Sequence, residues 1–232
     1  MVTNKPSDLF IWAHRGASAV APENSMAAFR AAEVTGADGI ELDIHLSRDG
    51  IPVVIHDETV DRTTNGSGPV AAKNIAELLD LDIGSWFSAD YAGERIPLLT
   101  EVLAWIGSRM RLNIEIKDQH AGQAVLAVLK DFPAADVLVS SFNHKALVRL
   151  RQIDNRLPIA FLTESPFWRL AVRRALDCSA ESFHPKAVFL TRNLVSFCHA
   201  HGLKVYPWTD GKLLREKEMR RRGVDGFFTD LP

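Results

Sequence analysis

Short apolar segments alternate along the chain with longer segments whose apolar residues recur every three or four positions. The short segments are typical of strands and cover 10–13, 39–46, 112–116, 137–140, 159–162, 181–184, 203–208 and 226–229. The longer segments predict helices at 25–35, 100–109, 121–132, 144–153, 167–176, 192–201 and 212–222. Alternating strands and helices indicate a parallel α/β sheet, and eight strands favour a closed (β/α)8 TIM barrel over an open, doubly wound sheet.

The second strand and the residues after it form the most informative local pattern. Apolar and polar residues alternate strictly, so Glu41, Asp43 and His45 share one face of the strand and the apolar residues share the other. A turn signal at Asp49-Gly50 leads straight into a further apolar segment that ends at His56. Because so short a connection permits only antiparallel pairing, we expect an extra hairpin strand that brings His56 level with Asp43.

Two departures from a regular barrel are visible in the sequence. Residues 57–96 form a long insertion with a turn at 65–68 and a short helical pattern at 75–81. Since the insertion directly follows His56, we expect it to lie over the barrel mouth. The sequence stops at Pro232, just after the eighth strand, so the last helix of the barrel is expected to be missing. No linker divides the chain, and we expect a single domain over 1–232.

Composition narrows the class of protein. The chain has 232 residues, of which 47% are hydrophobic, and its formal net charge is −2. We therefore expect one large core, no nucleic-acid partner and no stable membrane association. Cys178 and Cys198 lack metal-site spacing and are expected to be buried free thiols, and no apolar run suits a secretory signal, so we expect a cytoplasmic location. A monomer and a homo-oligomer remain equally open.

The chemistry-bearing residues follow the predicted strands, whose C-terminal ends carry the functional groups in parallel barrels. Glu41 and Asp43 lie on the second strand, and Glu115 lies on the third. Burying such carboxylates is costly without a partner or an ion. Together they would form an oxygen-rich pocket for one divalent cation, Mg²⁺ or Ca²⁺.

Cationic and titratable side chains surround this expected metal site. Arg15 and Lys117 are placed to bind an anion, and His14 and His56 are candidates to move protons. A cation, two positively charged side chains and two imidazoles together indicate phosphoryl-transfer chemistry on a phosphodiester.

A set of short motifs, taken in order over residues 10–232, resembles the glycerophosphodiester phosphodiesterase family. They are His14-Arg15-Gly16, Pro22-Glu23-Asn24, Glu41-Leu42-Asp43, His56-Asp57, Arg62-Thr63-Thr64-Asn65-Gly66, Ile96-Pro97-Leu98-Leu99, Glu115-Ile116-Lys117, Ser140-Ser141-Phe142 and Gly223-Val224-Asp225-Gly226 followed by Thr229-Asp230. A further motif, Gly84-Ser85-Trp86-Phe87, resembles the bacterial cytosolic branch of the family.

The resemblance implies a metal-dependent barrel that hydrolyses deacylated phospholipids to sn-glycerol 3-phosphate and an alcohol. It implies that His14 and His56 are the acid–base pair and that Glu41, Asp43 and Glu115 hold the metal. It also implies that Arg15 and Lys117 contact the phosphate and that Trp208 is an aromatic residue near the substrate. The chain departs from the family pattern at Thr209-Asp210-Gly211, so Asp210 receives no role.

Several alternatives stay open at this point. The same barrel could act on lysophospholipids or sphingomyelin with a phospholipase D-type activity, which would need an apolar approach to the membrane. A non-catalytic barrel that binds phosphorylated metabolites would have lost one of the histidines or carboxylates. The head group, the preferred metal and the nucleophile, which is water or a glycerol hydroxyl, are also open. We assign His14 as the base and His56 as the acid.

Other residues admit two interpretations each. Glu23 and Asn24 could cap the following helix, or they could join the site by bonding Arg15 and the metal-binding residues. The aromatic residues of the insertion could pack within it or shape the alcohol side of the pocket: Trp86, Phe87 and Tyr91. His45 faces the same side as Asp43 but lies near the turn, so a structural role is expected.

Overall fold

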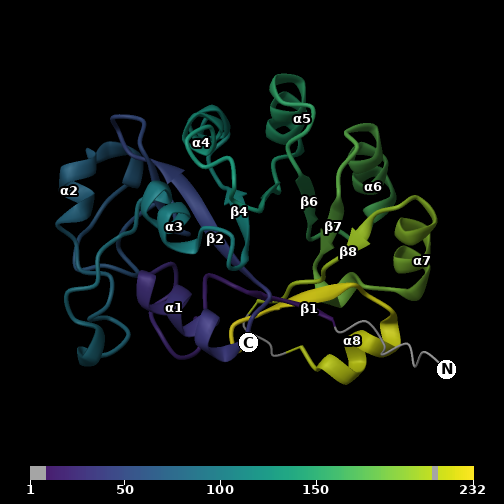
Figure 1. Cartoon of the computed structure of the whole chain (residues 1–232), viewed down its shortest axis with the longest axis horizontal. Helices are drawn as coiled ribbons and strands as arrows, with labels where there is room; N and C mark the ends of the chain where they lie inside the picture. The colour runs from purple at the N-terminus through teal and green to yellow at the C-terminus, as the bar shows by residue number, and fades with distance from the viewer. Residues whose placement is uncertain (1–8, 211–213) are drawn as a thin grey trace.

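The computed structural model describes residues 9–210 and 214–232, and in these ranges it shows the predicted barrel. Eight parallel strands stand in the order β8-β7-β6-β5-β4-β2-β1-β9, with helices around them (Figure 1). The strands are β1 (Phe10–Ala13), β2 (Gly39–Leu46), β4 (Arg111–Ile116), β5 (Val137–Ser141), β6 (Ile159–Thr163), β7 (Ser182–Pro185), β8 (Lys204–Val205) and β9 (Gly226–Thr229).

The helices agree closely with the predicted periodic segments. They are α1 (Met26–Thr35), α2 (Ile75–Leu79), α3 (Leu99–Ile106), α4 (Ala121–Leu129), α5 (His144–Ile153), α6 (Trp168–Asp177), α7 (Arg192–Ala200) and α8 (Glu216–Arg222). Ser25 caps α1 by accepting a hydrogen bond from the backbone N of Ala28, and Gly36 ends the helix with a φ of 84°. The predicted start of α8 at Lys212 lies outside the described residues.

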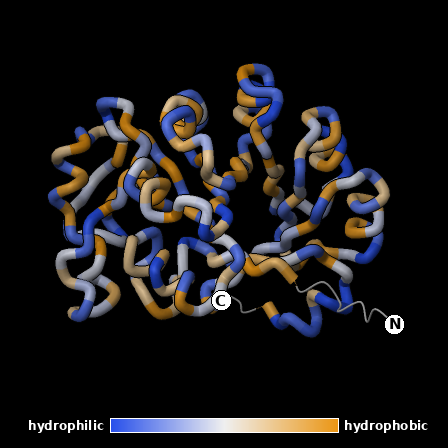
Figure 2. Tube along the Cα trace, in the orientation of Figure 1, coloured by the Kyte–Doolittle hydropathy of each residue, from blue (hydrophilic) through white to orange (hydrophobic). Residues whose placement is uncertain are grey.

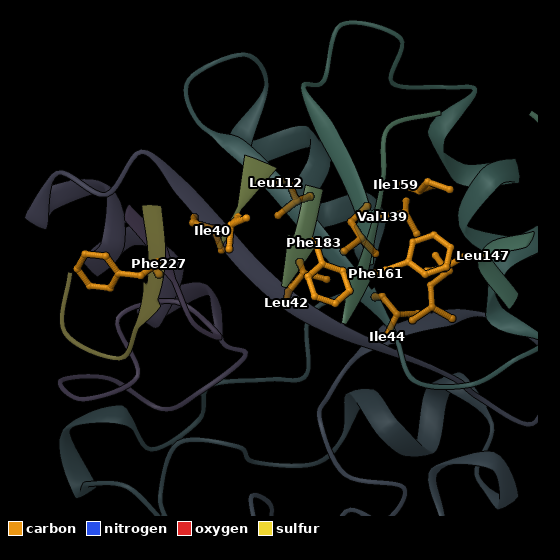
Figure 3. Close-up of a cluster of buried hydrophobic side chains, with 14 of the residues drawn as sticks. Ile40, Leu42, Ile44, Leu112, Val139, Leu147, Ile159, Phe161, Phe183 and Phe227 are labelled. Atoms are coloured by element: carbon orange, nitrogen blue, oxygen red, sulfur yellow. The ribbon is translucent and has the colours of Figure 1, made fainter. Parts of the chain in front are cut away.

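The two faces of the strands have different surroundings. The apolar residues of β2 point outward and pack with those of other strands and of the surrounding helices, including Leu112, Val139 and Leu147 (Figure 3). On the other face of the strands, Trp12, Leu138, Ala160, Tyr206 and Phe228 form a separate buried cluster. Orange and blue segments alternate along the tube in Figure 2, as expected for elements with one apolar and one polar side.

The predicted hairpin is confirmed. β3 (Pro52–Val54) pairs antiparallel with the end of β2, with Ile44 opposite Val54, and the backbone N of Ile55 donates to the carbonyl of Asp43. β1 pairs with the first residues of β2, at Gly39 and Ile40. β3 therefore continues the barrel wall beyond the end of β1, and this placement brings His56 near the residues that follow β1.

The insertion after β3 has a small core of its own. The core consists of Val53, Ile55, Val60, Val70, Leu78, Ile83 and Ile96, so residues of the hairpin and the insertion share it. In Figure 1 the insertion and α2 lie at the edge of the molecule beside β2 and α3. The aromatic residues of the insertion contact one another edge to face: Trp86 with Phe87, and Phe87 with Tyr91. That the insertion lies over the mouth of the barrel stays a prediction.

The barrel closes between β8 and β9 with few contacts. Backbone hydrogen bonds join Asp225 to Val205 at 3.1 Å and Phe228 to Pro207 at 3.0 Å. The predicted strand over 203–208 was too long, because β8 covers only Lys204–Val205. Tyr206 and Trp208 still donate backbone hydrogen bonds to Phe183 and Pro185, while Pro207 between them has no N–H to donate on the other side. No helix follows β9 in the described residues, and Phe227 on its outer face is buried in the main core.

No helix in the described part of the chain is both long enough and apolar enough to cross a membrane. Cys178 and Cys198 are buried and unpaired, as predicted.

Gly226 allows β9 to approach β1, and its replacement tests this packing. A Cβ atom at this position would lie 2.1 Å from the carbonyl oxygen of Phe10, which is backbone and cannot rotate away. We expect Gly226→Ala to lower the free energy of unfolding by about 1–3 kcal/mol, the usual range for overpacking. Gly122→Ala is the control, because its new Cβ meets only the side chain of Leu150. Urea unfolding curves measure both, and equal stability of the two variants would contradict this account.

Candidate active site

A cavity of about 550 Å³ opens at the C-terminal ends of the strands. Seven of the eight predicted site residues line it: His14, Arg15, Glu41, His56, Glu115, Lys117 and Trp208. The eighth, Asp43, is buried beside them and contacts both Arg15 and Lys117. The fold therefore brings all eight residues together.

The three carboxylates meet because of strand register. Asp43 on β2 stands opposite Glu115 on β4, and Glu41 lies two residues before Asp43 on the same face. One oxygen from each of the three lies within 4.8 Å of the others, and all three residues are buried.

Burial and mutual repulsion shift the protonation of this cluster. Burial, and after it the charge of Asp43, raise the pKa of Glu115 to about 7, and the same causes raise the pKa of Glu41. Burial also acts to raise the pKa of Asp43, but Lys117 and Arg15 overcome it and hold that pKa below its ordinary value. The Lys117 Nζ lies 2.5 Å from Glu115 Oε1 and 3.1 Å from Asp43 Oδ1.

The cluster fits a hard divalent cation. The Oε1 atom of Glu41 has no hydrogen-bond partner among the described residues, and the facing oxygens of Asp43 and Glu115 meet only the Lys117 ammonium. Buried carboxylate oxygens without directional partners suit a metal ion that replaces their lost hydration. Oxygen ligands favour Mg²⁺ or Ca²⁺ over zinc or copper.

The loop between β1 and α1 is shaped around this cluster. Arg15 and Asn24 both adopt left-handed backbone conformations, with φ of 56° and 55°. The Arg15 amide donates to Glu41 Oε2 at 2.9 Å, and the Asn24 side chain donates to Asp43 Oδ2 at 2.8 Å. Such backbone conformations cost about 1–3 kcal/mol each, so the surrounding contacts must hold them. Asn24 thus joins the carboxylate cluster, while Ser25 caps α1.

Arg15 is held by acidic residues on two sides. Its Nη1 donates to Glu23 Oε1 at 2.8 Å, and its Nε lies 3.5 Å from Asp43 Oδ2. The predicted contact between Glu23 and Arg15 is therefore present. The Arg15 side chain is only 18% exposed, and with Lys117 it places two positive charges beside the carboxylates at the pocket wall.

Each predicted catalytic histidine is oriented by a carboxylate. His14 Nδ1 donates to Asp230 Oδ1 at 2.7 Å, and His56 Nδ1 donates to Asp57 Oδ1 at 2.6 Å. These bonds favour the tautomer that leaves Nε2 free to exchange a proton. Burial lowers the pKa of His56, partly opposed by the charge of Asp43. His45, whose predicted role was structural, bonds the carbonyl oxygen of His56 through Nε2 at 3.0 Å.

Aromatic and acidic side chains complete the pocket wall. Phe142 and Trp208 meet edge to face with ring centroids 5.3 Å apart, and Trp208 Nε1 donates to the carbonyl of His184. Asp210, which received no role from the sequence, lines the pocket and forms an ion pair with Lys186. This wall could contact the organic part of a substrate.

Sequence reasoning missed the roles of Asp57, Asp230 and Phe142. All three stood in the motifs named above: Asp57 directly follows His56, Asp230 follows the last strand, and Phe142 follows Ser140-Ser141. Asp57 could have been found from its adjacency to His56. The pairing of Asp230 with His14 joins residues 216 positions apart and needed the order of strands around the barrel.

A parallel barrel with charged groups at the C-terminal strand ends is the arrangement of a barrel enzyme. The particular family follows from comparison with known proteins. Residues 14–232 match the model of the "Glycerophosphoryl diester phosphodiesterase family". The chain is 41% identical over 230 residues to a glycerophosphodiester phosphodiesterase of Caldanaerobacter subterraneus, with 95% of this chain and 93% of that protein covered.

Two solved structures support the same assignment. A phosphodiesterase of Oleispira antarctica, in complex with the product sn-glycerol-3-phosphate, has a TM-score of 0.88 and 32% identity, covering 96% of this chain and 93% of that one. A glycerophosphodiester phosphodiesterase of Agrobacterium tumefaciens has a TM-score of 0.81 and 29% identity, covering 95% and 94%. The chain belongs to this family, and it is a hydrolase of glycerophosphodiesters.

Cation binding should release protons near neutral pH. Because the pKa of Glu115 is raised to about 7 and that of Glu41 is also raised, the metal-free cluster holds protons that a cation must displace. We expect affinity for Mg²⁺ or Ca²⁺ to fall as the pH falls below 7. Calorimetry at pH 7 in two buffers of different ionisation enthalpy measures the released protons. Glu115→Gln should release fewer, and identical enthalpies for the unaltered protein in both buffers would refute this description.

Asp230 should matter for turnover rather than for metal binding. In Asp230→Asn the carboxylate that orients His14 is lost, and we expect kcat to fall by about 10²-fold or more, the scale of an acid–base contribution. Ser18→Ala removes only a hydroxyl that donates to Asp230 Oδ1 and to the carbonyl of His14, and it should have a much smaller effect. Steady-state kinetics together with Mg²⁺ titration would test this, and comparable losses in the two variants would contradict it.

Proposed function

We propose that the protein hydrolyses glycerophosphodiesters, the deacylated products of phospholipids, to sn-glycerol 3-phosphate and an alcohol. In this proposal it uses one divalent cation, Mg²⁺ or Ca²⁺, and the acid–base pair His14 and His56. The observation that carries the proposal is a single pocket lined by buried carboxylates, two positively charged side chains and two imidazoles whose Nδ1 atoms are already engaged. The product bound to the Oleispira antarctica phosphodiesterase supports the same reaction.

The carboxylates would hold the cation, and the positive side chains would bind the phosphate. Glu41, Asp43 and Glu115 are the proposed ligands, and the cation would stabilise negative charge on the phosphate as the ester bond breaks. Arg15 and Lys117 supply fixed positive charge at the same wall of the pocket. Because both are already oriented by acidic neighbours, little reorganisation is needed as charge builds up on the phosphate oxygens.

The two histidines divide the proton transfers. His14 takes a proton from the attacking hydroxyl, which belongs to water or to the neighbouring glycerol hydroxyl. His56 gives a proton to the departing alkoxide. Its pKa is lowered in the free protein, and a bound phosphate anion would raise it again, which favours the protonated form that an acid requires. Trp208 and Phe142 would contact the organic part of the substrate.

The alternatives predict different substrates. A lysophospholipase D or sphingomyelinase D type would need acyl chains near the mouth, and a non-catalytic barrel would turn over nothing. A panel of glycerophosphodiesters and lysolipids, assayed with Mg²⁺, Ca²⁺ and chelator, separates the three. We expect release of sn-glycerol 3-phosphate from the glycerophosphodiesters only, and full activity with chelator would remove the metal from the proposal. The cytoplasmic location and the single domain over 1–232 stay predictions, and the choice between a monomer and a homo-oligomer stays open.

Leaving-group chemistry tests the histidine roles. His14→Ala and His56→Ala should each lower kcat by about 10²-fold or more on a natural substrate. A p-nitrophenyl ester of glycerol phosphate has a leaving group that needs little protonation, so it should restore turnover in His56→Ala and leave His14→Ala impaired. Single-turnover rates on both substrates provide the measurement. Restoration of His14→Ala alone would reverse the assignment, and restoration of neither would exclude His56 as the acid.

A further inference from the structure

Arg62 lies outside the pocket lining, yet its guanidinium binds two carboxylates at the same time. Its Nη1 and Nη2 donate to the two oxygens of Glu23 at 2.8 and 2.7 Å. Its Nε and Nη2 donate to the two oxygens of Asp57 at 2.6 and 3.0 Å. Four hydrogen bonds from one planar guanidinium to two carboxylates form a geometrically specific contact.

Each of these carboxylates has a second partner inside the active site. Asp57 accepts the Nδ1 hydrogen bond of His56, and Glu23 accepts a hydrogen bond from Nη1 of Arg15. The contacts run without a break from the acid–base residue His56, through Asp57, Arg62 and Glu23, to the phosphate-binding residue Arg15.

The two ends of this chain of contacts belong to different loops. Arg15 and Glu23 lie in the loop between β1 and α1, while His56 and Asp57 follow β3. Arg62 belongs to the insertion and bonds to both loops. Although Arg62 is 45% exposed, Asp57 is 27% and Glu23 only 13% exposed. An exposed ion pair contributes little, but bidentate geometry and a shared network make this contact stronger than an isolated pair.

We propose that Arg62 is a positioning residue that fixes Arg15 and His56 relative to each other, through Glu23 and Asp57. This inference rests on the proposed function of the pocket. Arginine suits the task because its fork spans two carboxylates at once, whereas a lysine ammonium offers one point charge and no fork. Displacing His56 or Arg15 by a fraction of an ångström from the bound phosphate slows the reaction without removing either group.

A matched control exists at Arg111, on the first residue of β4 and away from the pocket. It also binds two carboxylates: Glu181 through Nη1 and Nη2 at 2.6 and 2.7 Å, and Asp136 through Nε at 3.1 Å. Arg111→Lys therefore loses a similar fork contact without touching the catalytic residues. It reports what a purely structural loss of this kind does to the protein.

The experiment compares Arg62→Lys and Arg62→Ala with Arg111→Lys in the Mg²⁺-loaded enzyme. We expect kcat to fall by about 10- to 10²-fold in both Arg62 variants, the scale of misplacing a catalytic group, with unchanged Mg²⁺ affinity. Histidine NMR should show His56 titrating at higher pH in Arg62→Ala, since Asp57 loses its cationic partner, and shifted by less in Arg62→Lys, which keeps a positive charge. Apart from Asp57, the charged groups that act on His56 are Asp43, Arg15 and Lys117, and none of them is substituted in these variants. Arg111→Lys should lower thermal stability while kcat and the His56 titration stay as in the unaltered protein.

The outcomes separate the possibilities. If both Arg62 variants behave like Arg111→Lys, with lower stability but normal kcat, and His56 in Arg62→Ala titrates as in the unaltered protein, Arg62 is merely structural and the inference fails. If Arg62→Ala does not fold, Arg62→Lys decides alone by kcat, which should still fall because its ammonium cannot reproduce the four fork bonds. If the unaltered protein cleaves no glycerophosphodiester, the proposed function fails, but the His56 titration still shows whether Arg62 acts on that residue.

Discussion

The arrangement of this molecule depends on burying three carboxylates against one another. At an effective dielectric constant of 20, two like charges about 4 Å apart repel by roughly 4 kcal/mol, so the group cannot stay fully ionised alone. This repulsion is reduced by Lys117, Arg15 and the side-chain amide of Asn24, all of which contact the cluster. Burial, and after it the charge of Asp43, still raise the pKa of Glu41 and Glu115, and a divalent cation would favour their ionised forms.

The groups around this cluster have further partners outside it. Arg15, which contacts Asp43, also donates to Glu23. Each histidine donates to an aspartate outside the cluster, His14 to Asp230 and His56 to Asp57. The left-handed backbone at Arg15 and Asn24 is where the chain bends to bring the first loop against the cluster. Strain in two residues is offset by hydrogen bonds to Glu41 and Asp43, so the loop and the cluster stabilise each other.

Much of this could be predicted from the sequence, because periodicity reports directly on which face of an element is buried. The bounds of β1, β2, β9 and α5 agree with their predicted ranges, and the turn at Asp49-Gly50 correctly predicted the hairpin. Seven of the eight site residues, all but Trp208, stood in local motifs, so each of these could be recognised within a few positions. What could not be predicted were contacts between distant segments. Asp230 reaches His14 only because β9 pairs with β1, and Arg62 reaches Glu23 only because the insertion folds back on the first loop. The strand predicted over 203–208 was too long because its apolar character continues beyond the two residues that pair regularly with β7.

The seam between β8 and β9 divides the pocket into two parts of unequal rigidity. The residues proposed to surround the phosphate lie on or after β1, β2, β3 and β4, each of which pairs with a neighbouring strand. Trp208 and Asp210 instead follow β8, which no strand ladder joins to β9 across the seam in the described residues, although Trp208 exchanges backbone hydrogen bonds with Pro185 and Ala187 on its other side. Small openings of the barrel are cheapest there. The side of the pocket proposed to meet the organic part of the substrate can therefore adapt to different groups, while the geometry proposed around the phosphate is preserved.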